Sequence, residues 1–249
     1  SPVMDVYPPP INYYVQLGRI NSLRSEPADA PGFASRFFVN DASSILYILD
    51  KKTRKFTPYL DFAQVFPKFS SARGNSTGLI SFIFDPAYAK NGKFYTVHSE
   101  YLGKNAPAAP TNAHMPGLNL DGYQVTPPVN PPEGPVCCES VVNEWTDTNI
   151  RNATFEGTAR EILRVGFSFT RHQMDDLLFN PLARPGSEDY GNLYISLGDG
   201  GGGEVAGVTH GLPQHLNALP GKILRITPDI SLRPKDMLSS NGRYRIPSA

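Results

Sequence analysis

The sequence predicts an all-β protein, and three observations support this. Short runs alternate between apolar and polar residues, as in 192–198, where Leu193, Ile195 and Leu197 share one face. The 249 residues include 24 prolines and 22 glycines, which favours many turns over long helices. No segment has a convincing amphipathic helical pattern. These features fit a sandwich, a barrel or a propeller, and spacing alone does not choose among the three.

The expected strands follow one another with turn residues between them. A charged turn at 51–55 separates two strands, and Asp85-Pro86 and Asn91-Gly92 are further turn signals. The predicted strands cover residues 35–40, 45–50, 56–60, 79–84, 93–101, 140–146, 160–167, 177–180, 192–198 and 222–227.

We expect one domain over residues 1–249, with two irregular segments. Residues 1–33 open with a proline run at 8–10 and are predicted to form an extended arm. Residues 102–138 have little periodicity and contain two proline pairs, so a surface insertion is expected there.

Composition excludes some classes of partner. Lysine plus arginine and aspartate plus glutamate both total 23, so no net field favours nucleic acid or an acidic membrane. No apolar run approaches the length of a membrane span, and no signal peptide is visible. Glycosylation sequons at 75–77 and 152–154 favour an exported protein.

The two cysteines, Cys137 and Cys138, are adjacent. A metal site needs spaced ligands, so we predict no metal site at this pair. Three alternatives stay open for it: free thiols, a strained vicinal disulfide, or bridges to other parts of the protein.

The candidate site is a histidine that precedes a strand and an aspartate that ends the same strand. His172 lies before the predicted strand at 192–198, and Asp199 ends that strand inside the glycine run at 198–203. Glycines there would let backbone or ligand approach closely. A loop histidine bonded to backbone and an aspartate that caps a turn are the structural alternatives.

Other polar residues are expected to have structural or solvent roles. The histidines at 98, 114, 210 and 215 lack ligand-like spacing, and Trp145 is expected in the core. The acid pair Asp175-Asp176 suggests calcium only faintly, and a solvated loop is the expectation.

Several blocks of the sequence follow one another in a distinctive order. Residues 78–86 read GLISFIFDP and residues 89–95 read AKNGKFY. Further blocks are EILRV at 161–165, His172-Gln173, LYISLGDGGG at 193–202 and PGKILRI at 220–226. In this order the blocks resemble the soluble quinoprotein sugar dehydrogenases, also called the glucose/sorbosone dehydrogenase family. The resemblance spans residue 37 to the end, interrupted by the insertion.

The resemblance implies a six-bladed β-propeller, of which this chain supplies about the first half. It implies pyrroloquinoline quinone (PQQ) held by calcium, with calcium ligands outside this segment, and oxidation of an aldose by a periplasmic or secreted enzyme. A cytochrome or quinone would then accept the electrons. His172 takes the position of the general base, Asp199 that of a substrate-binding residue, and Ser76, Arg171 and Gln173 fall among the cofactor contacts.

The chain also departs from the family pattern. Arg171 stands where the family usually has Asp or Asn, and Ser76 stands where a glutamine touches the quinone. Met174, Asp175 and Asp176 replace small residues after the base. These departures favour an alternative: a non-catalytic binding propeller similar to the hedgehog-interacting proteins, with the insertion as a partner surface.

Overall fold

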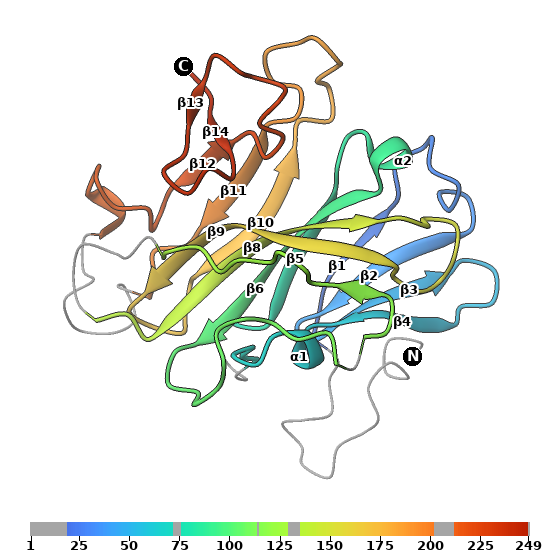
Figure 1. Ribbon diagram of the computed structural model, residues 1–249, viewed down its shortest axis with the longest axis horizontal. Coiled ribbons are helices and arrows are strands. Elements are labelled where there is room, and N and C mark those ends of the chain that lie inside the picture. The colour runs from blue at the N-terminus through green and yellow to red at the C-terminus, as the bar shows by residue number, and fades with distance from the viewer. Residues whose placement is uncertain (1–18, 72–75, 114, 129–134, 202–211, 249) are drawn as a thin grey trace.

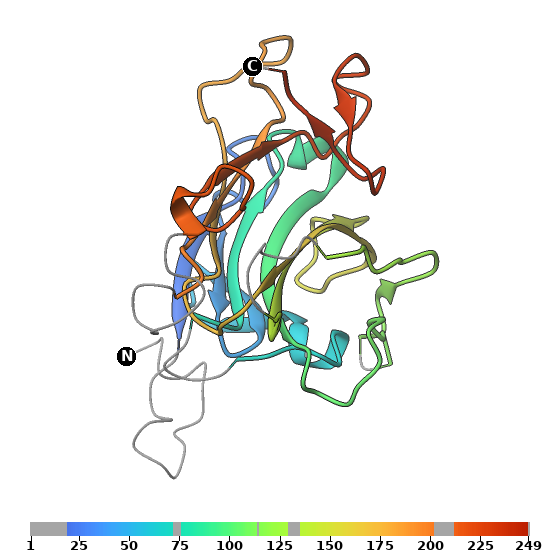
Figure 2. The ribbon, with the colours of Figure 1, turned by 90° about the vertical axis from the view of Figure 1, so that its left-hand side faces the viewer.

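The computed structural model describes residues 19–71, 76–113, 115–128, 135–201 and 212–248 (Figure 1). Three larger sheets stand side by side, and a small hairpin follows them (Figures 1 and 2). Almost every strand pair is antiparallel, the exception being one short parallel pair, so each larger sheet is built chiefly from strands that follow one another along the chain.

The first sheet is a four-stranded meander in chain order. Its strands are β1 (Ile20–Ser25), β2 (Arg36–Asp41), β3 (Ile45–Asp50) and β4 (Phe56–Asp61). The short helix α1 (Phe62–Val65) follows at once, because the Asp61 side chain accepts a hydrogen bond from the Ala63 amide and caps the first turn.

The second sheet is the central one and has the order β5-β6-β8-β9-β7. Its elements, with the short helix α2, are β5 (Leu79–Phe84), α2 (Tyr88–Asn91), β6 (Lys93–Tyr101), β7 (Leu118–Asn119), β8 (Cys138–Asp147) and β9 (Gly157–Phe167). Gly78, just before β5, has φ +125°, and a Cβ there would lie 1.8 Å from the Ala42 carbonyl oxygen. Only glycine allows this close approach between the first two sheets.

The third sheet has three strands, and the hairpin comes after it. The elements are β10 (Met174–Phe179), β11 (Leu193–Leu197), the 3-10 turn η3 (Leu212–Gln214), β12 (Ile223–Ile226), β13 (Met237–Leu238) and β14 (Arg245–Ile246).

Two apolar cores join the three sheets. The first contains Phe38, Phe82 and Trp145, and it is rich in edge-to-face aromatic pairs. The second contains Val97, Leu163 and residues of β10 and β11. The alternation of β11 explains its part in this core: Leu193, Ile195 and Leu197 are buried, and the residues between them are half-buried.

The first strand of each larger sheet lies at an edge of that sheet, and we call these three strands, β1, β5 and β10, the inner strands. β5 contacts both β1 and β10. Side chains link these strands: Asn21 donates to the Ile80 carbonyl oxygen at 3.0 Å, and Asp176 accepts from Arg24 at 2.6 Å and from Ser81 at 2.5 Å. The N-terminal ends of all three strands meet at one end of the molecule.

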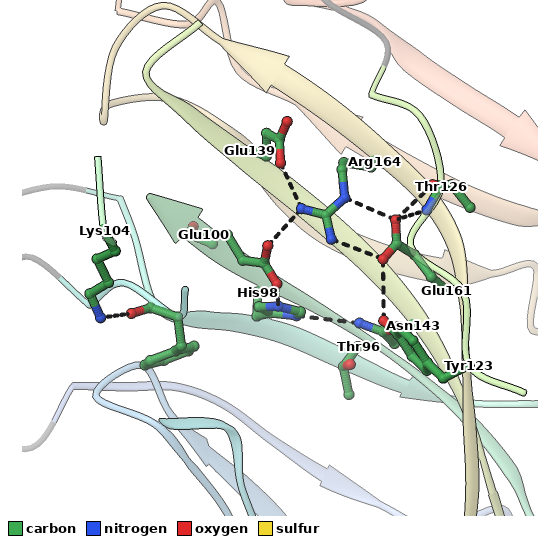
Figure 3. A network of polar contacts seen from close by, with 12 residues as sticks. Thr96, His98, Glu100, Lys104, Tyr123, Thr126, Glu139, Asn143, Glu161 and Arg164 are labelled. Carbon is green, nitrogen blue, oxygen red and sulfur yellow. Dashed lines mark hydrogen bonds and ion pairs between the residues drawn. The ribbon is translucent and has the colours of Figure 1, made fainter. Parts of the chain in front are cut away.

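A buried ionic network lies on one face of the second sheet (Figure 3). Arg164 of β9, only 3% exposed, binds Glu100 of β6 and Glu139 of β8 at 2.6 Å each. It also makes a two-pronged contact with Glu161, at 2.9 Å for both nitrogens. We call Arg164 and these three glutamates the Arg164 cluster. It joins three neighbouring strands through one guanidinium group.

Two further groups complete the surroundings of the Arg164 cluster. His98 is fully buried against the Phe66 ring, with ring centroids 4.1 Å apart, and its Nε2 lies 3.2 Å from Glu100. From the insertion, the Thr126 amide and hydroxyl donate to Glu161 at 2.9 and 2.6 Å. The expected structural role of the histidine at position 98 is therefore confirmed.

The all-β prediction is confirmed, as is the core position of Trp145. All ten predicted strands are present, with ends that differ by at most three residues. The strand at 177–180 begins earlier, at Met174, so the expected solvated loop at Asp175-Asp176 is wrong.

The two predicted irregular segments need correction where they are described. Residues 20–25 of the predicted arm form β1, and residues 1–18 lie outside the described residues. In the predicted insertion, β7 pairs with β9, and Cys138 already belongs to β8. Among the described residues, no helix has the length and apolar character needed to cross a membrane.

The Arg164 cluster predicts a specific acid sensitivity. Burial would raise the pKa of Glu100, but the hydrogen bond and charge of His98 and the charge of Arg164 outweigh it and hold that pKa at about 2, against a usual 4.5. Ionised Glu100 therefore stabilises the folded state above about pH 4.5, and this contribution, about 3 kcal/mol, is lost as the pH falls towards 2.

Urea unfolding measured from pH 7 to pH 2 tests this prediction. We expect Glu100→Gln to reduce the acid-induced loss of unfolding free energy by about 3 kcal/mol relative to wild type. Glu188→Gln, at an exposed position, is the matched control and should leave the loss unchanged. Equal pH dependence in wild type and Glu100→Gln would contradict the assignment.

Candidate functional site

The loop between β9 and β10 and the turn after β11 are clamped together by backbone hydrogen bonds. The Gly198 amide donates to the Gln173 carbonyl oxygen at 2.7 Å, and the Gly200 amide donates to the His172 carbonyl oxygen at 2.9 Å. A Cβ at Gly198 would lie 2.4 Å from the His172 carbonyl oxygen. The glycine run is therefore needed for the two segments to approach this closely.

The clamp brings the predicted base and the predicted aspartate together. Nδ1 of His172 lies 2.8 Å from Oδ1 of Asp199. Both side chains are partly exposed, at 39% and 33%. His172 has φ +48°, a left-handed conformation that non-glycine residues rarely adopt. A strained histidine oriented by a carboxylate is a typical feature of functional sites.

Asp199 makes both kinds of contact that the sequence offered as alternatives: it contacts the proposed base, and it caps a turn. Besides contacting His172, its Oδ1 accepts a hydrogen bond from the Gly201 amide at 2.8 Å. It caps the turn and orients the imidazole with the same oxygen. In this arrangement Asp199 positions the histidine, and its contact with a substrate stays a prediction.

Gln173 has a different environment from its neighbour His172. It is 1% exposed, and its Oε1 accepts from the hydroxyls of Ser99 and Ser140 at 3.1 Å each. Its Nε2 donates to the Phe169 carbonyl oxygen and to Cys138 Sγ, both at 3.1 Å. Its amide is thus engaged inside the protein. A cofactor contact by Gln173 stays a prediction that this placement does not favour.

The other two predicted cofactor residues lie at the same end of the molecule. Arg171 is exposed beside His172, and its Cβ lies 3.4 Å from where a Cβ on Gly201 would be. Ser76 is exposed just before β5. Of the three predicted cofactor residues, only Ser76 lines the groove described next.

A polar groove of about 530 Å³ runs along the inner strands near their N-terminal ends. It is lined by Arg19, Asn21, Ser22, Arg24, Ser76, Ile80, Ser81, Asp175 and Asp176. The Arg24–Asp176 ion pair crosses it. A larger hollow of about 770 Å³ lies at the opposite ends of these strands and does not include His172 or Asp199.

Sequence reasoning missed most of this groove. Arg19, Asn21 and Arg24 fall within the predicted arm, and Asp176 falls within the expected solvated loop. Their polarity hides the strand pattern, because an inner strand that faces a wet groove lacks apolar residues on that face. The only sequence signal for these residues was their position along the chain. Arg19, Asn21 and Arg24 lie at the start of the first sheet, and Asp176 lies at the start of the third.

The groove offers groups that suit an anionic quinone. Nε of Arg24 is buried and has no hydrogen-bond partner among the described residues, so a carboxylate there would satisfy it. Arg19, Arg24 and Ser76 could hold the carboxylates of PQQ. Among the described residues, no group of three or more His, Cys, Asp or Glu side chains is arranged to hold a metal ion.

Comparison with solved structures finds soluble sugar dehydrogenases. The PQQ-bound form of an aldose sugar dehydrogenase from Streptomyces coelicolor is 18% identical with a TM-score of 0.52, over 86% of this chain and 46% of that protein. A putative oxidoreductase (glucose dehydrogenase) from Thermus thermophilus is 15% identical with a TM-score of 0.53, over 93% of this chain and 50% of that protein.

Comparison with curated proteins finds distant plant relatives. The HIPL2 protein of Arabidopsis thaliana is 29% identical over 178 residues, which is 68% of this chain and 24% of the plant protein. No protein-family model matches the chain. The chain spans about half the length of the solved dehydrogenases and about a quarter of HIPL2.

These comparisons establish the fold. The chain has the architecture of about half of a six-bladed propeller of the soluble PQQ-dependent sugar dehydrogenase type, and HIPL proteins are distant relatives in sequence. The predicted resemblance is confirmed at this level. Because the identities are low, similarity of fold does not carry catalysis or cofactor binding with it.

The placement of Gln173 predicts a large cost for its removal. Gln173→Ala would leave the Phe169 carbonyl oxygen and two serine hydroxyls with fewer partners inside the protein, so the free energy of unfolding should fall by about 2–4 kcal/mol. Gln214→Ala, at an exposed position, should change it by less than about 0.5 kcal/mol. Urea unfolding compares the two variants, and similar small effects would refute the buried role.

Proposed function

We propose that this chain is the N-terminal half of a quinone-dependent dehydrogenase that oxidises an aldose or a related sugar or alcohol. The observation that carries the proposal is the His172–Asp199 pair, with Nδ1 and Oδ1 2.8 Å apart, at the groove end of the inner strands of a sugar-dehydrogenase fold. A periplasmic or secreted location and a cytochrome or quinone as electron acceptor belong to the same proposal.

We infer a proton-transfer role for His172, and its contact with Asp199 supports this role. The Asp199 carboxylate accepts the Nδ1 hydrogen, which places the basic lone pair of neutral imidazole on Nε2. Nε2 can then take the hydroxyl proton of a sugar as its C–H bond is broken. Arg171, the residue before His172, is exposed beside it.

The quinone, when bound, supplies the acceptor for the hydride. Arg19, Arg24 and Ser76 of this chain would hold the quinone. His172 would take the proton. Calcium ligands are expected from segments other than the described residues.

A second candidate function is a binding propeller without catalysis. The internal engagement of Gln173 favours it, because a residue aligned with the family's cofactor contacts is occupied by Ser99, Ser140 and Cys138 instead. The relatives of this chain in sequence include the plant HIPL1 and HIPL2 proteins. The insertion would then be the surface for a partner.

Reconstitution tests the enzyme proposal. The protein is incubated with PQQ and calcium, and dye reduction is followed with a panel of aldoses. We expect a sugar-dependent rate that falls by about 10²–10⁴-fold in His172→Ala, because general base catalysis contributes that much.

His215→Ala is the matched control, since it removes another exposed histidine. It should retain the wild-type rate. Stoichiometric quinone binding by absorbance, without a sugar-dependent rate, would favour a cofactor-binding protein with another substrate. Absence of quinone binding would favour the binding propeller, and full activity in His172→Ala would defeat the assigned base.

A further inference from the structure

The adjacent cysteines lie at the same end of the molecule as the His172 loop. Cys138 is the first residue of β8 and pairs with Tyr101 and Phe167, the last residues of β6 and β9. Both thiols are free; Cys138 is buried and Cys137 is half-buried. One thiol of the pair is thus nearer to solvent, and the other reaches the interior.

Cys138 is in direct contact with the loop that carries His172. Its Sγ donates to the Phe169 carbonyl oxygen at 3.1 Å and accepts from Gln173 Nε2 at 3.1 Å. Gln173 Nε2 also donates to the Phe169 carbonyl oxygen at 3.1 Å, which closes a small ring of hydrogen bonds. The thiol therefore contacts the residue that directly follows the proposed base.

The two thiols differ in acidity. The neighbouring Cys138 thiol lowers the pKa of the Cys137 thiol despite the opposing effect of burial. The neighbouring Cys137 thiol, together with burial, raises the pKa of the Cys138 thiol. Cys137, the more accessible and more acidic of the two, is the thiol that would react first.

We propose that Cys137 and Cys138 form a dithiol–disulfide switch that sets the order of the loop 168–173. The oxidant is a low-molecular-mass disulfide. The Cys137 thiolate attacks one of its sulfurs, which forms a mixed disulfide and releases one thiolate. Cys138 passes its proton to the released thiolate and attacks the Cys137 sulfur, which forms the Cys137–Cys138 bond and releases the second thiolate. This second thiolate takes up from water the proton that Cys137 gave up when it ionised. Two protein thiols are oxidised, and one external disulfide is reduced to two thiols.

The geometry of neighbouring residues makes such a bond reversible. Adjacent α-carbons are about 3.8 Å apart, whereas bridged cysteines usually have α-carbons about 4.4–6.8 Å apart. A bond between neighbours is therefore strained, and strained disulfides are the readily reduced, regulatory ones. A stable structural disulfide is not expected between adjacent residues.

Oxidation has a defined structural consequence. The Cys138 sulfur loses the hydrogen that it donates to the Phe169 carbonyl oxygen, and it moves towards Cys137 and away from Gln173. The loop 168–173 loses about one hydrogen bond. Its equilibrium between closed and locally open forms therefore shifts about fivefold towards the open form. Because His172 belongs to this loop, its imidazole becomes less firmly placed. This inference does not depend on the proposed oxidoreductase activity.

Hydrogen exchange on the protein before and after treatment with oxidised glutathione tests the switch. Peptide mapping of the treated protein should show the peptide that contains both cysteines lighter by two hydrogens and resistant to alkylation. Amide exchange in residues 168–173 should become about fivefold faster, as expected for one lost hydrogen bond. Dithiothreitol should restore the original rate.

Cys137→Ser is the matched control. It removes the half-buried thiol and keeps the Cys138 contacts, so oxidised glutathione should neither close a ring nor change exchange at 168–173. If this variant fails to fold, wild type alkylated with N-ethylmaleimide before treatment takes its place. A stable glutathione adduct, a bridge from either cysteine to another part of the protein, or an oxidised pair with unchanged loop exchange would each overturn the proposal.

Discussion

The buried guanidinium of Arg164 is the interaction on which the central sheet depends. It binds carboxylates from β6, β8 and β9 at once and so links three strands that the backbone ladders pair. Removing one partner of such a buried group costs about 3–5 kcal/mol, because a charge is left uncompensated. The cluster also reaches the insertion, since Glu161 accepts two hydrogen bonds from Thr126. One ionic centre thus orders both regular strands and an irregular segment.

Two of the strands that Arg164 joins also anchor the candidate site. Glu100 and Glu139 carry the ionic contacts, and their chain neighbours Ser99 and Ser140 point to the other face of the same strands. There the two hydroxyls donate to the Gln173 amide oxygen. Gln173 is therefore held by the opposite face of the sheet that Arg164 organises, and the position of the His172 loop follows from that.

The strands could be predicted from sequence because runs of β-branched, aromatic and other apolar residues lie between turn signals, and in β11 the apolar residues also alternate with polar ones. β1 could not, since its only apolar residues, Ile20 and Leu23, are three positions apart and most of its polar residues line the groove. The His172–Asp199 pairing was accessible from the motif, because antiparallel neighbours bring the start of β10 and the end of β11 together. The burial of Gln173 could not be predicted from the motif. The sequence does not distinguish an amide that faces a ligand from one that binds two distant serines.

His172 and Gln173 have different roles in the loop between β9 and β10. His172 is half-exposed and Gln173 is buried, so consecutive residues face solvent and core. Backbone bonds from the glycine turn after β11 hold the loop from the third sheet, and the Gln173 amide holds it from the second. The left-handed backbone conformation at His172 is unfavourable by itself, and these two attachments hold the residue in it. The imidazole is therefore placed by the packing between two sheets, and a shift of one sheet against the other would move it.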